Sequence, residues 1–503
     1  MAIIDTSGGT REILSRLRDI ESLLQSQGER IAFLTSEARG VPAAHPSHNE
    51  TSPQSQGSVP MTGMQPSSSM PFTPWAFPGL DVQSSMPDLP PLTIPVGHRT
   101  SSSYLLSLPS MKALIGEYPT DLLYLLESKN SLPDGLAFDR VSVPQPLIEL
   151  NKEDANDLVS SFFSVAHPHH PILDEAEFGE IYRQFLQIGP DSSIESALCM
   201  VVLALGDVCA SLPTNHPEEF GNSPPGMQYM QHAMPTLISL SSWSFSYSLL
   251  LPQALVLASV YFAYIVRPLH SWRLIYSAST ILQFKLSGID SRQEGPNSKE
   301  SIIRLFWSCF LVECDRLAEL ELPRSGLQQL TDEISLPSCA NLGPMQSTCY
   351  LAEISIRRLL NSVHNSLYPS KKHVLTLSAT SLMAPDDFSI RDIASMMSVC
   401  DELHSQLETW HSSIPEPYRP SLDAGQGSEH GDRQDILRIR YFAARHIIYR
   451  PFVLYMATHG TQHATEAMMD KAALCLDSCR QYIHNTTRVL RRPGQYTWTF
   501  SVS

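Results

Sequence analysis

Apolar residues recur with helical spacing over most of the chain. From residue 100 onward, runs of hydrophobic side chains follow a period near 3.6, and loops rich in Pro, Gly, Ser and Asn separate them. The alternation of apolar and polar residues that marks a strand is nowhere sustained. The pattern therefore predicts an all-α fold, with helices over 153–164, 194–210, 249–266, 272–287, 301–321, 349–367, 391–411, 434–457 and 463–489.

The first forty residues carry a different pattern. Steps of four and three residues alternate between positions that would form one seam of a helix: Ile13, Leu17, Ile20, Leu24, Gln27, Ile31 and Leu34. This spacing is typical of a short coiled coil, so we expect 1–40 to be a dimerisation helix that pairs two copies or joins another protein. The repeat lasts only about three heptads, so an amphipathic helix docked on the body is the alternative.

The composition changes abruptly over 41–100. This stretch holds 12 of the 38 prolines together with runs of serine, and it has only four charged residues. A segment of this composition buries too little apolar surface to offset its chain entropy. We therefore expect a disordered Pro/Ser-rich linker over 41–100, followed by a helical body over 101–503.

Charge and cysteine content narrow the possible classes of function. The net charge is −16 and no basic module is present, so contact with DNA would have to come from elsewhere. The nine cysteines are an odd number, scattered through apolar segments, as expected for buried thiols in a reducing compartment. The N-terminus lacks the positive stretch and apolar core of a secretory signal. Together these features favour a cytosolic or nuclear protein.

One apolar segment, 249–266, approaches the length of a membrane span. It contains Pro252, Gln253 and Ser259, and no second span accompanies it. Its length and polarity favour a buried core helix over a membrane helix, so we expect no membrane contact.

A histidine cluster is the first candidate site for chemistry. His167, His169 and His170 lie near Asp174, and imidazoles beside a carboxylate can bind a metal. Two prolines interrupt the segment, however, and remove the helical spacing that a zinc pair would need. A turn without metal is therefore the favoured interpretation, and a helical enzyme that uses these side chains is the less favoured alternative.

Two cysteine pairs are the second candidate. Cys309 and Cys314, and likewise Cys475 and Cys479, fall on predicted helices in apolar surroundings, where free thiols behave as small hydrophobes. Glycine-rich phosphate loops, nucleophile elbows and His-Glu-x-x-His motifs are absent from the sequence. The sequence therefore predicts no catalytic, cofactor-binding or metal-binding residue.

The order of several motifs is more specific than any one of them. The segments HSWRLIYSASTILQFKLSGID (270–290) and SIIRLFWSCFLVECDRLAELELPRSGLQQLTDEISLP (301–337) stand between helical blocks at 101–128 and 154–178 and others at 402–420 and 436–455. Together they resemble the middle-homology regulatory domain of fungal zinc-cluster transcription factors over 100–495. The residues that carry the central signature are Trp272, Arg273, Arg304, Trp307, Asp315, Arg316 and Pro323.

This resemblance implies a stack of packed helices that represses, dimerises or receives a signal, in a nuclear regulator of RNA polymerase II transcription. The family pattern has no catalytic residue. On the helix 301–317, buried or half-buried ion pairs could tie the helix to its neighbours through Arg304, Glu313, Asp315 and Arg316. Trp272, Trp307 and Trp410 are most simply core anchors.

Members of the family bind two zinc ions through six cysteines in an N-terminal module that reads DNA. Here the first cysteine is Cys199, so we expect no zinc in this chain and DNA contact only through a missing module or a partner. The last residues, 491–503, resemble the entrance to further helices, which suggests a regulatory domain truncated at its C-terminus. A small-molecule effector is a further possibility, because large all-α domains often enclose an apolar pocket.

Overall fold

The computed structural model describes residues 100–119, 122–133, 136, 150–212, 223–246, 248–288, 296–318, 320, 322–368, 390–423, 432–491 and 494–502. Within these ranges the chain forms 15 α-helices and no strand, which confirms the predicted all-α class for this part of the protein. The expected coiled-coil seam at 13–34 and the expected linker up to residue 99 lie outside the described residues.

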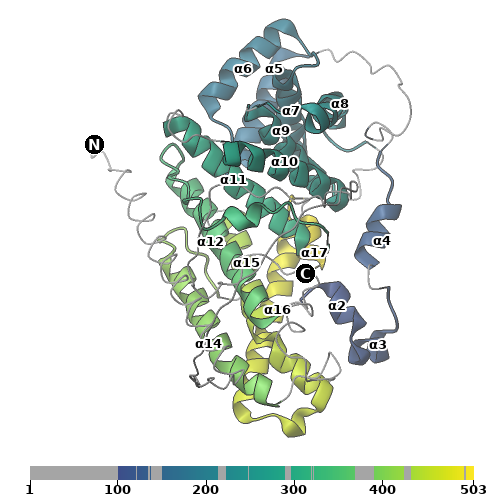
Figure 1. Ribbon diagram of the computed structural model, residues 1–503, viewed down its shortest axis with the longest axis vertical. Helices are drawn as coiled ribbons and strands as arrows, with labels where there is room; N and C mark the ends of the chain where they lie inside the picture. Colours follow the sequence, from purple (N-terminus) through teal and green to yellow (C-terminus); the bar gives the residue numbers. More distant parts are fainter. Residues whose placement is uncertain are drawn as a thin grey trace, which may run out of the picture.

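Figure 1 shows the described helices, which follow one another along the chain. In order they are α2 (Ser102–Ser107), α3 (Pro109–Ile115), α4 (Leu122–Lys129), α5 (Lys152–Ser161), α6 (Glu175–Ile188), α7 (Ile194–Ser211), α8 (Met227–Trp243), α9 (Leu250–Tyr264), α10 (Pro268–Gly288), α11 (Pro296–Leu317), α12 (Pro344–Leu367), α14 (Ile390–Ser413), α15 (Asp432–His459), α16 (Glu466–Val489) and α17 (Thr497–Val502). A π-helical turn, η2 (Phe162–Ala166), and a 3₁₀ turn, η3 (His167–His169), continue α5, and further 3₁₀ turns are η5 (Leu327–Leu330) and η6 (Thr461–His463).

All nine predicted helical segments are found, with ends that differ by a few residues. The predicted segment 301–321 extends furthest beyond its helix, because α11 ends at Leu317. Two substantial helices, α6 and α8, were not predicted. α8 contains Pro235 in its interior, which argues against a helix when only the sequence is read.

The buried apolar side chains of the body form two hydrophobic clusters. The first cluster comprises buried side chains of α5 to α11 together with one face of α12, represented by Tyr350 and Ile354. The second cluster comprises the opposite face of α12, represented by Cys349 and Ile356, together with α14 to α17. α12 therefore lies between the two clusters and contributes one face to each.

The centre of the first cluster is formed by two very apolar helices. α9 is buried from Leu251 to Tyr264, so the predicted core helix at 249–266 is confirmed. α7 is long and apolar enough to cross a membrane, with mean hydropathy 1.8, but 72% of it is buried inside the protein. At Gly206 of α7, a Cβ atom would lie 2.1 Å from the carbonyl oxygen of Leu158, so glycine permits α5 and α7 to approach closely.

The described chain begins at a buried point in the second cluster. Thr100, the last residue of the expected linker, is only 6% exposed. Its carbonyl oxygen accepts a hydrogen bond from Arg450 Nη1 at 2.9 Å, and its hydroxyl lies 2.8 Å from His364 Nδ1. Two residues later, the Ser102 hydroxyl donates to the carbonyl oxygen of Val502. The entry to the body is thus bound to α12, α15 and α17 at once.

Candidate functional site

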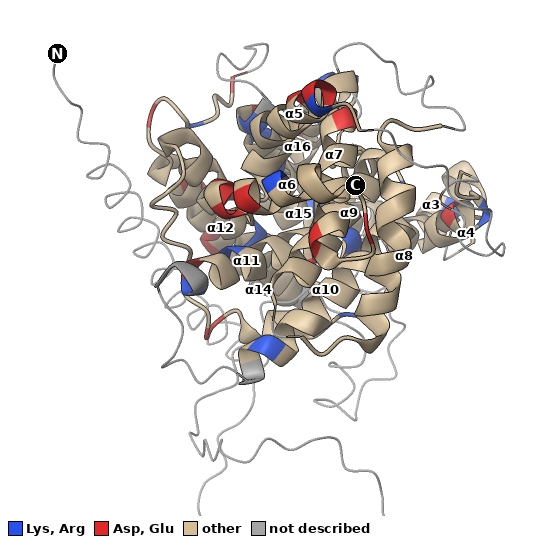
Figure 2. Cartoon of the chain, turned by 90° about the horizontal axis from the view of Figure 1, so that it is seen from above, with Lys and Arg blue, Asp and Glu red and all other residues tan. Residues whose placement is uncertain are grey.

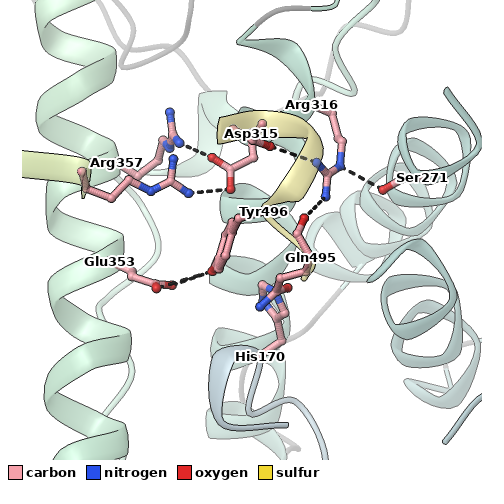
Figure 3. Close-up of polar contacts among 10 residues, drawn as sticks. His170, Ser271, Asp315, Arg316, Glu353, Arg357, Gln495 and Tyr496 are labelled. Carbon is pink, nitrogen blue, oxygen red and sulfur yellow. Dashed lines mark hydrogen bonds and ion pairs between the residues drawn. The ribbon is translucent and has the colours of Figure 1, made fainter. Parts of the chain in front are cut away.

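A group of charged and polar side chains is buried where the two hydrophobic clusters meet (Figure 3). Elsewhere acidic and basic positions are interspersed over the described helices (Figure 2). We call this buried group the polar junction. Its members are His170, Ser271, Asp315, Arg316, Glu353, Arg357, Arg440, Gln495, Tyr496 and Thr499.

The carboxylate of Asp315 is the centre of the polar junction. Its Oδ1 atom accepts a hydrogen bond from Arg357 Nη2, and its Oδ2 atom accepts one from Arg440 Nη2 at 2.6 Å. The side chains of these three residues are at most 9% exposed. Asp315 lies near the end of α11, whereas Arg357 is on α12 and Arg440 on α15. One carboxylate therefore joins a helix of the first cluster to two helices of the second.

Arg316, the neighbour of Asp315, binds neutral acceptors instead of a carboxylate. Its Nε atom donates to Ser271 Oγ at 2.9 Å, and its Nη1 atom donates to Thr499 Oγ1 at 3.1 Å. Its Nη2 atom donates to the carbonyl oxygen of Gln495 at 3.3 Å. These bonds connect α11 to α10, to α17 and to the segment that leads into α17 (Figure 3).

Glu353 and Tyr496 form the remaining side of the polar junction. The hydroxyl of Tyr496 donates to Glu353, with oxygen–oxygen distances of 3.2 and 3.4 Å. The guanidinium of Arg440 lies 5.3 Å from the ring centroids of Tyr496 and Phe500, a cation–π arrangement that makes α17 part of the same unit.

Burial and neighbouring charges shift the pKa values of the ionisable groups in the polar junction. Burial raises the pKa of Asp315, but Arg440 and Arg357 outweigh that effect and hold the pKa below its usual value. Burial raises the pKa of Glu353, against a smaller opposing effect of Arg433 and Arg440. Burial also lowers the pKa of Arg357, although Asp315 partly offsets the effect. Asp315 is thus the anionic group on which the guanidinium groups of Arg357 and Arg440 depend.

The structure divides the signature residues into two groups. Asp315 and Arg316 are in the polar junction. Asp315 forms ion pairs with neighbouring helices, as expected from the sequence. Trp272 and Trp307 instead hold the loop after α11: Trp272 Nε1 donates to the carbonyl oxygen of Pro323 at 3.1 Å, and Trp307 Nε1 donates to that of Ser335 at 2.9 Å. Trp307 is fully buried, as expected of a core anchor, whereas Trp272 is only partly buried.

The two remaining signature arginines make local contacts. The guanidinium of Arg273 lies 5.7 Å from the ring centroid of Trp272. Arg304 is buried, with its Nε atom 3.8 Å from Glu300 Oε1, and its carbonyl oxygen accepts a hydrogen bond from Tyr350 at 2.9 Å. This last bond joins α11 to α12 away from the polar junction.

The histidine segment forms part of the core. The backbone turns of η2 and η3 carry it inward, where His167 Nε2 lies 3.1 Å from the carbonyl oxygen of Leu173 and His170 Nε2 lies 2.7 Å from Gln495 Oε1. Burial lowers the pKa of His167 and of His170 to about 4, so these rings are neutral at pH 7. Asp174 points elsewhere, because its carboxylate caps the start of α6.

The cysteines do not fit the zinc module of the resembling family. All nine are free thiols spread over several helices and loops, and eight of them are buried. Within the described part of the chain, no group of three or more His, Cys, Asp and Glu side chains is placed to hold a metal ion. The pairs Cys309/Cys314 and Cys475/Cys479 lie on α11 and α16, as predicted.

Several residues of the polar junction were not identified from the sequence, namely Glu353, Arg357, Arg440, Gln495 and Tyr496. A signal was present for the first two, because YLAEISIRRLL places a carboxylate and a guanidinium four residues apart within an apolar helical run. Charged residues are rarely buried without a partner, so such a pair on an apolar face marks a buried polar contact. Of their distant partners, Asp315 on α11 was identified from the sequence, whereas Tyr496 just before α17 gave no comparable signal.

Comparison with known proteins identifies the family of this chain. The model of the fungal specific transcription factor domain matches residues 159–412, which include the parts of the polar junction on α10, α11 and α12. A curated relative, the putative transcription factor ecdB of Aspergillus rugulosus, is 21% identical over 479 residues, covering 86% of this chain and 75% of the relative. No solved structure matches significantly. The chain therefore belongs to the fungal specific transcription factor domain family, whose members are transcription regulators and not enzymes.

Proposed function

We propose that this chain regulates RNA polymerase II transcription in the nucleus through its helical domain. The observation that carries the proposal is the family match over 159–412, supported by the relative ecdB, which is named a putative transcription factor. In this proposal the N-terminal seam pairs the chain with a second copy or with a related protein. A zinc module, on a partner or elsewhere in the polypeptide, supplies sequence-specific contact with DNA.

The polar junction suggests how such a domain could respond to a signal. Two separately packed clusters share α12, and buried charges link α11 to α12 and α15. Because a buried ion pair is strong only in a narrow geometry, a partner that shifted one cluster against the other would have to break it. The junction would therefore favour discrete arrangements of the two clusters over gradual bending.

A tethering assay tests the regulatory role. The full chain is fused to a heterologous DNA-binding domain and expressed in a fungal host with a reporter downstream of the matching sites. We expect the fusion to raise or lower reporter transcription several-fold relative to the DNA-binding domain alone. We expect the Asp315→Asn fusion to lose the effect at equal protein level. If the wild-type fusion leaves reporter transcription unchanged, the proposal is contradicted.

Imaging and pull-down test the location and the partner. A fluorescent fusion of the full chain should accumulate in the nucleus, and the chain should co-purify with a second copy or with a zinc-cluster protein. Replacement of Leu17 and Leu24 by Glu should abolish that co-purification, because charges in a coiled-coil seam oppose pairing. A chain excluded from the nucleus, or one whose partners are unaffected by the seam variant, would refute these parts of the proposal.

A further inference from the structure

The helix α16 has two different apolar faces. The inner face packs on α15 and is buried at positions that include Met468, Cys475 and Tyr482. A second set of residues, on the outer side, alternates steps of four and three along the helix. These residues are Met469, Ala473, Leu476, Arg480, Ile483 and Thr487, and all six are exposed to solvent. We call this set the outer seam.

The large apolar side chains of the outer seam are about half exposed. Met469, Leu476 and Ile483 recur every seven residues and are 46%, 53% and 63% exposed. Steps of four and three keep side chains on one side of a helix, which is the pattern by which one helix packs along another. The seam runs from the second to the last turn of α16, roughly 27 Å at about 1.5 Å per residue.

Charge along this face has a direction. The exposed acids Glu466 and Asp470 lie near the start of α16, and the exposed base Arg480 lies in its second half. Asp477 is already 3.7 Å from Arg445 of α15. The basic side chain of the first half, Lys471, is already bound to Asp401 of α14. The outer seam is therefore negative toward its start and positive toward its end.

We propose that the outer seam is a docking surface for α16 of a second copy of this chain, packed antiparallel about a two-fold axis near Leu476. In this register Leu476 meets its own counterpart, and Met469 meets Ile483 of the second copy. The small side chain of Ala473 faces the long side chain of Arg480, whose guanidinium then lies close to Asp470. A two-fold contact of this kind is self-complementary and closes at a dimer.

The charge pattern selects this orientation over the alternatives. A parallel pair in register would place each Arg480 beside the other and each Asp470 beside the other, which is unfavourable. An antiparallel pair centred two residues later would oppose Leu476 to Arg480 and leave apolar surface against charge. The register centred on Leu476 matches apolar side chains with apolar ones and brings Arg480 close to Asp470.

This contact rests on the part of the proposed function in which 13–34 pairs two copies of this chain, and it adds a second contact to that pairing. One pair of helices of this length buries less surface than a stable dimer needs, so the contact is weak alone. Two copies already joined through 13–34 would encounter each other at a high effective concentration, at which a weak contact forms.

Cysteine cross-linking of the full chain tests the register directly. We expect Leu476→Cys to form a disulfide-linked dimer under mild oxidation, at a yield several-fold above the unmodified chain and above Ser405→Cys. Ser405 is an exposed position on α14, which serves as the matched control. If each variant has the same midpoint of thermal unfolding as the unmodified chain, its fold is intact.

A second pair of variants tests the orientation. A mixture of Met469→Cys and Ile483→Cys chains should cross-link, whereas each variant alone should not. In the antiparallel register, Met469 of one copy and Met469 of the other lie fourteen residues apart along the helix axis, roughly 21 Å, and the same holds for the two copies of Ile483. The proposal is overturned if Leu476→Cys yields no more dimer than Ser405→Cys, as it would if the N-terminal seam or another protein occupied this face. It is also overturned if Met469→Cys alone cross-links as well as the mixture, which would indicate parallel packing.

Discussion

Removal of the negative charge of Asp315 should destabilise the whole body. Asp315→Asn keeps the shape of the side chain but leaves the guanidinium groups of Arg357 and Arg440 buried without their anion. Its new amide would also direct a donor toward one of them. Each ion pair has a gross attraction of about 4 kcal/mol at an effective dielectric constant near 20, and the cost of dehydrating the carboxylate opposes it.

The net loss follows from the charges that remain. Breaking a buried pair by removing one partner costs about 3 to 5 kcal/mol, because the other charge stays buried. With an unfolding entropy of about 2 cal/mol/K per residue over a few hundred residues, the midpoint of thermal unfolding should fall by roughly 4 to 7 °C.

Urea unfolding followed by tryptophan fluorescence measures the effect, because Trp307 and Trp410 are fully buried reporters in the first and second cluster. The matched control is Glu180→Gln, which removes an exposed pair with Arg183 on α6 and should leave the midpoint unchanged. Asp315→Asn combined with Arg440→Met should lose less than the sum of the two single variants. If Asp315→Asn unfolds at the same urea concentration as the unmodified chain, the polar junction does not hold the clusters together.

Two further predictions concern the first cluster and the histidine segment. Gly206→Ala should destabilise by roughly 1 to 3 kcal/mol, since its Cβ atom would meet the carbonyl oxygen of Leu158, whereas Gly179→Ala on α6, with nothing within 4 Å, should stabilise by up to about 1 kcal/mol. Equal effects in urea unfolding would show that α5 and α7 are not in close contact. Lowering the pH from 7 to 5 should cost roughly 2 kcal/mol for each of His167 and His170, because the unfolded state binds protons below about pH 6.5 while the buried rings, with pKa values of about 4, do not. The His167→Asn/His170→Asn variant should lose less stability over this interval, and an equal loss would contradict the assignment.

The fold class was predictable because each long helix buries a continuous apolar face. The segments 194–210 and 249–266 are apolar on nearly every side, and they are the helices buried most deeply. The helix α8 escaped prediction because Pro235 interrupts its pattern, although packing against α7 and α9 maintains the helix. Local propensity is a weak guide where tertiary contacts decide.

The polar junction was predictable only in part. Asp315 and Arg316 stood out because they are charged residues at the end of an apolar helix. Their partners Arg440 and Gln495 lie 125 and 179 residues away from them along the chain, and periodicity carries no information about such pairings. The outer seam of α16 shows the opposite situation, because the sequence contains its spacing but only the packing of the inner face on α15 reveals that it is exposed.

The bonds around Thr100 have a consequence for the order of folding. Its partners His364 and Arg450 lie 264 and 350 residues further along the chain, and Ser102 binds Val502, 400 residues away. During synthesis α5 to α11 leave the ribosome long before α15 and α17, so the first cluster can assemble while the start of the body still has no partner. Closing so long a loop is slow compared with packing neighbouring helices. The entry segment should therefore be secured late, after synthesis has reached α17, and a nascent chain halted before that point should expose 100–102 to proteases.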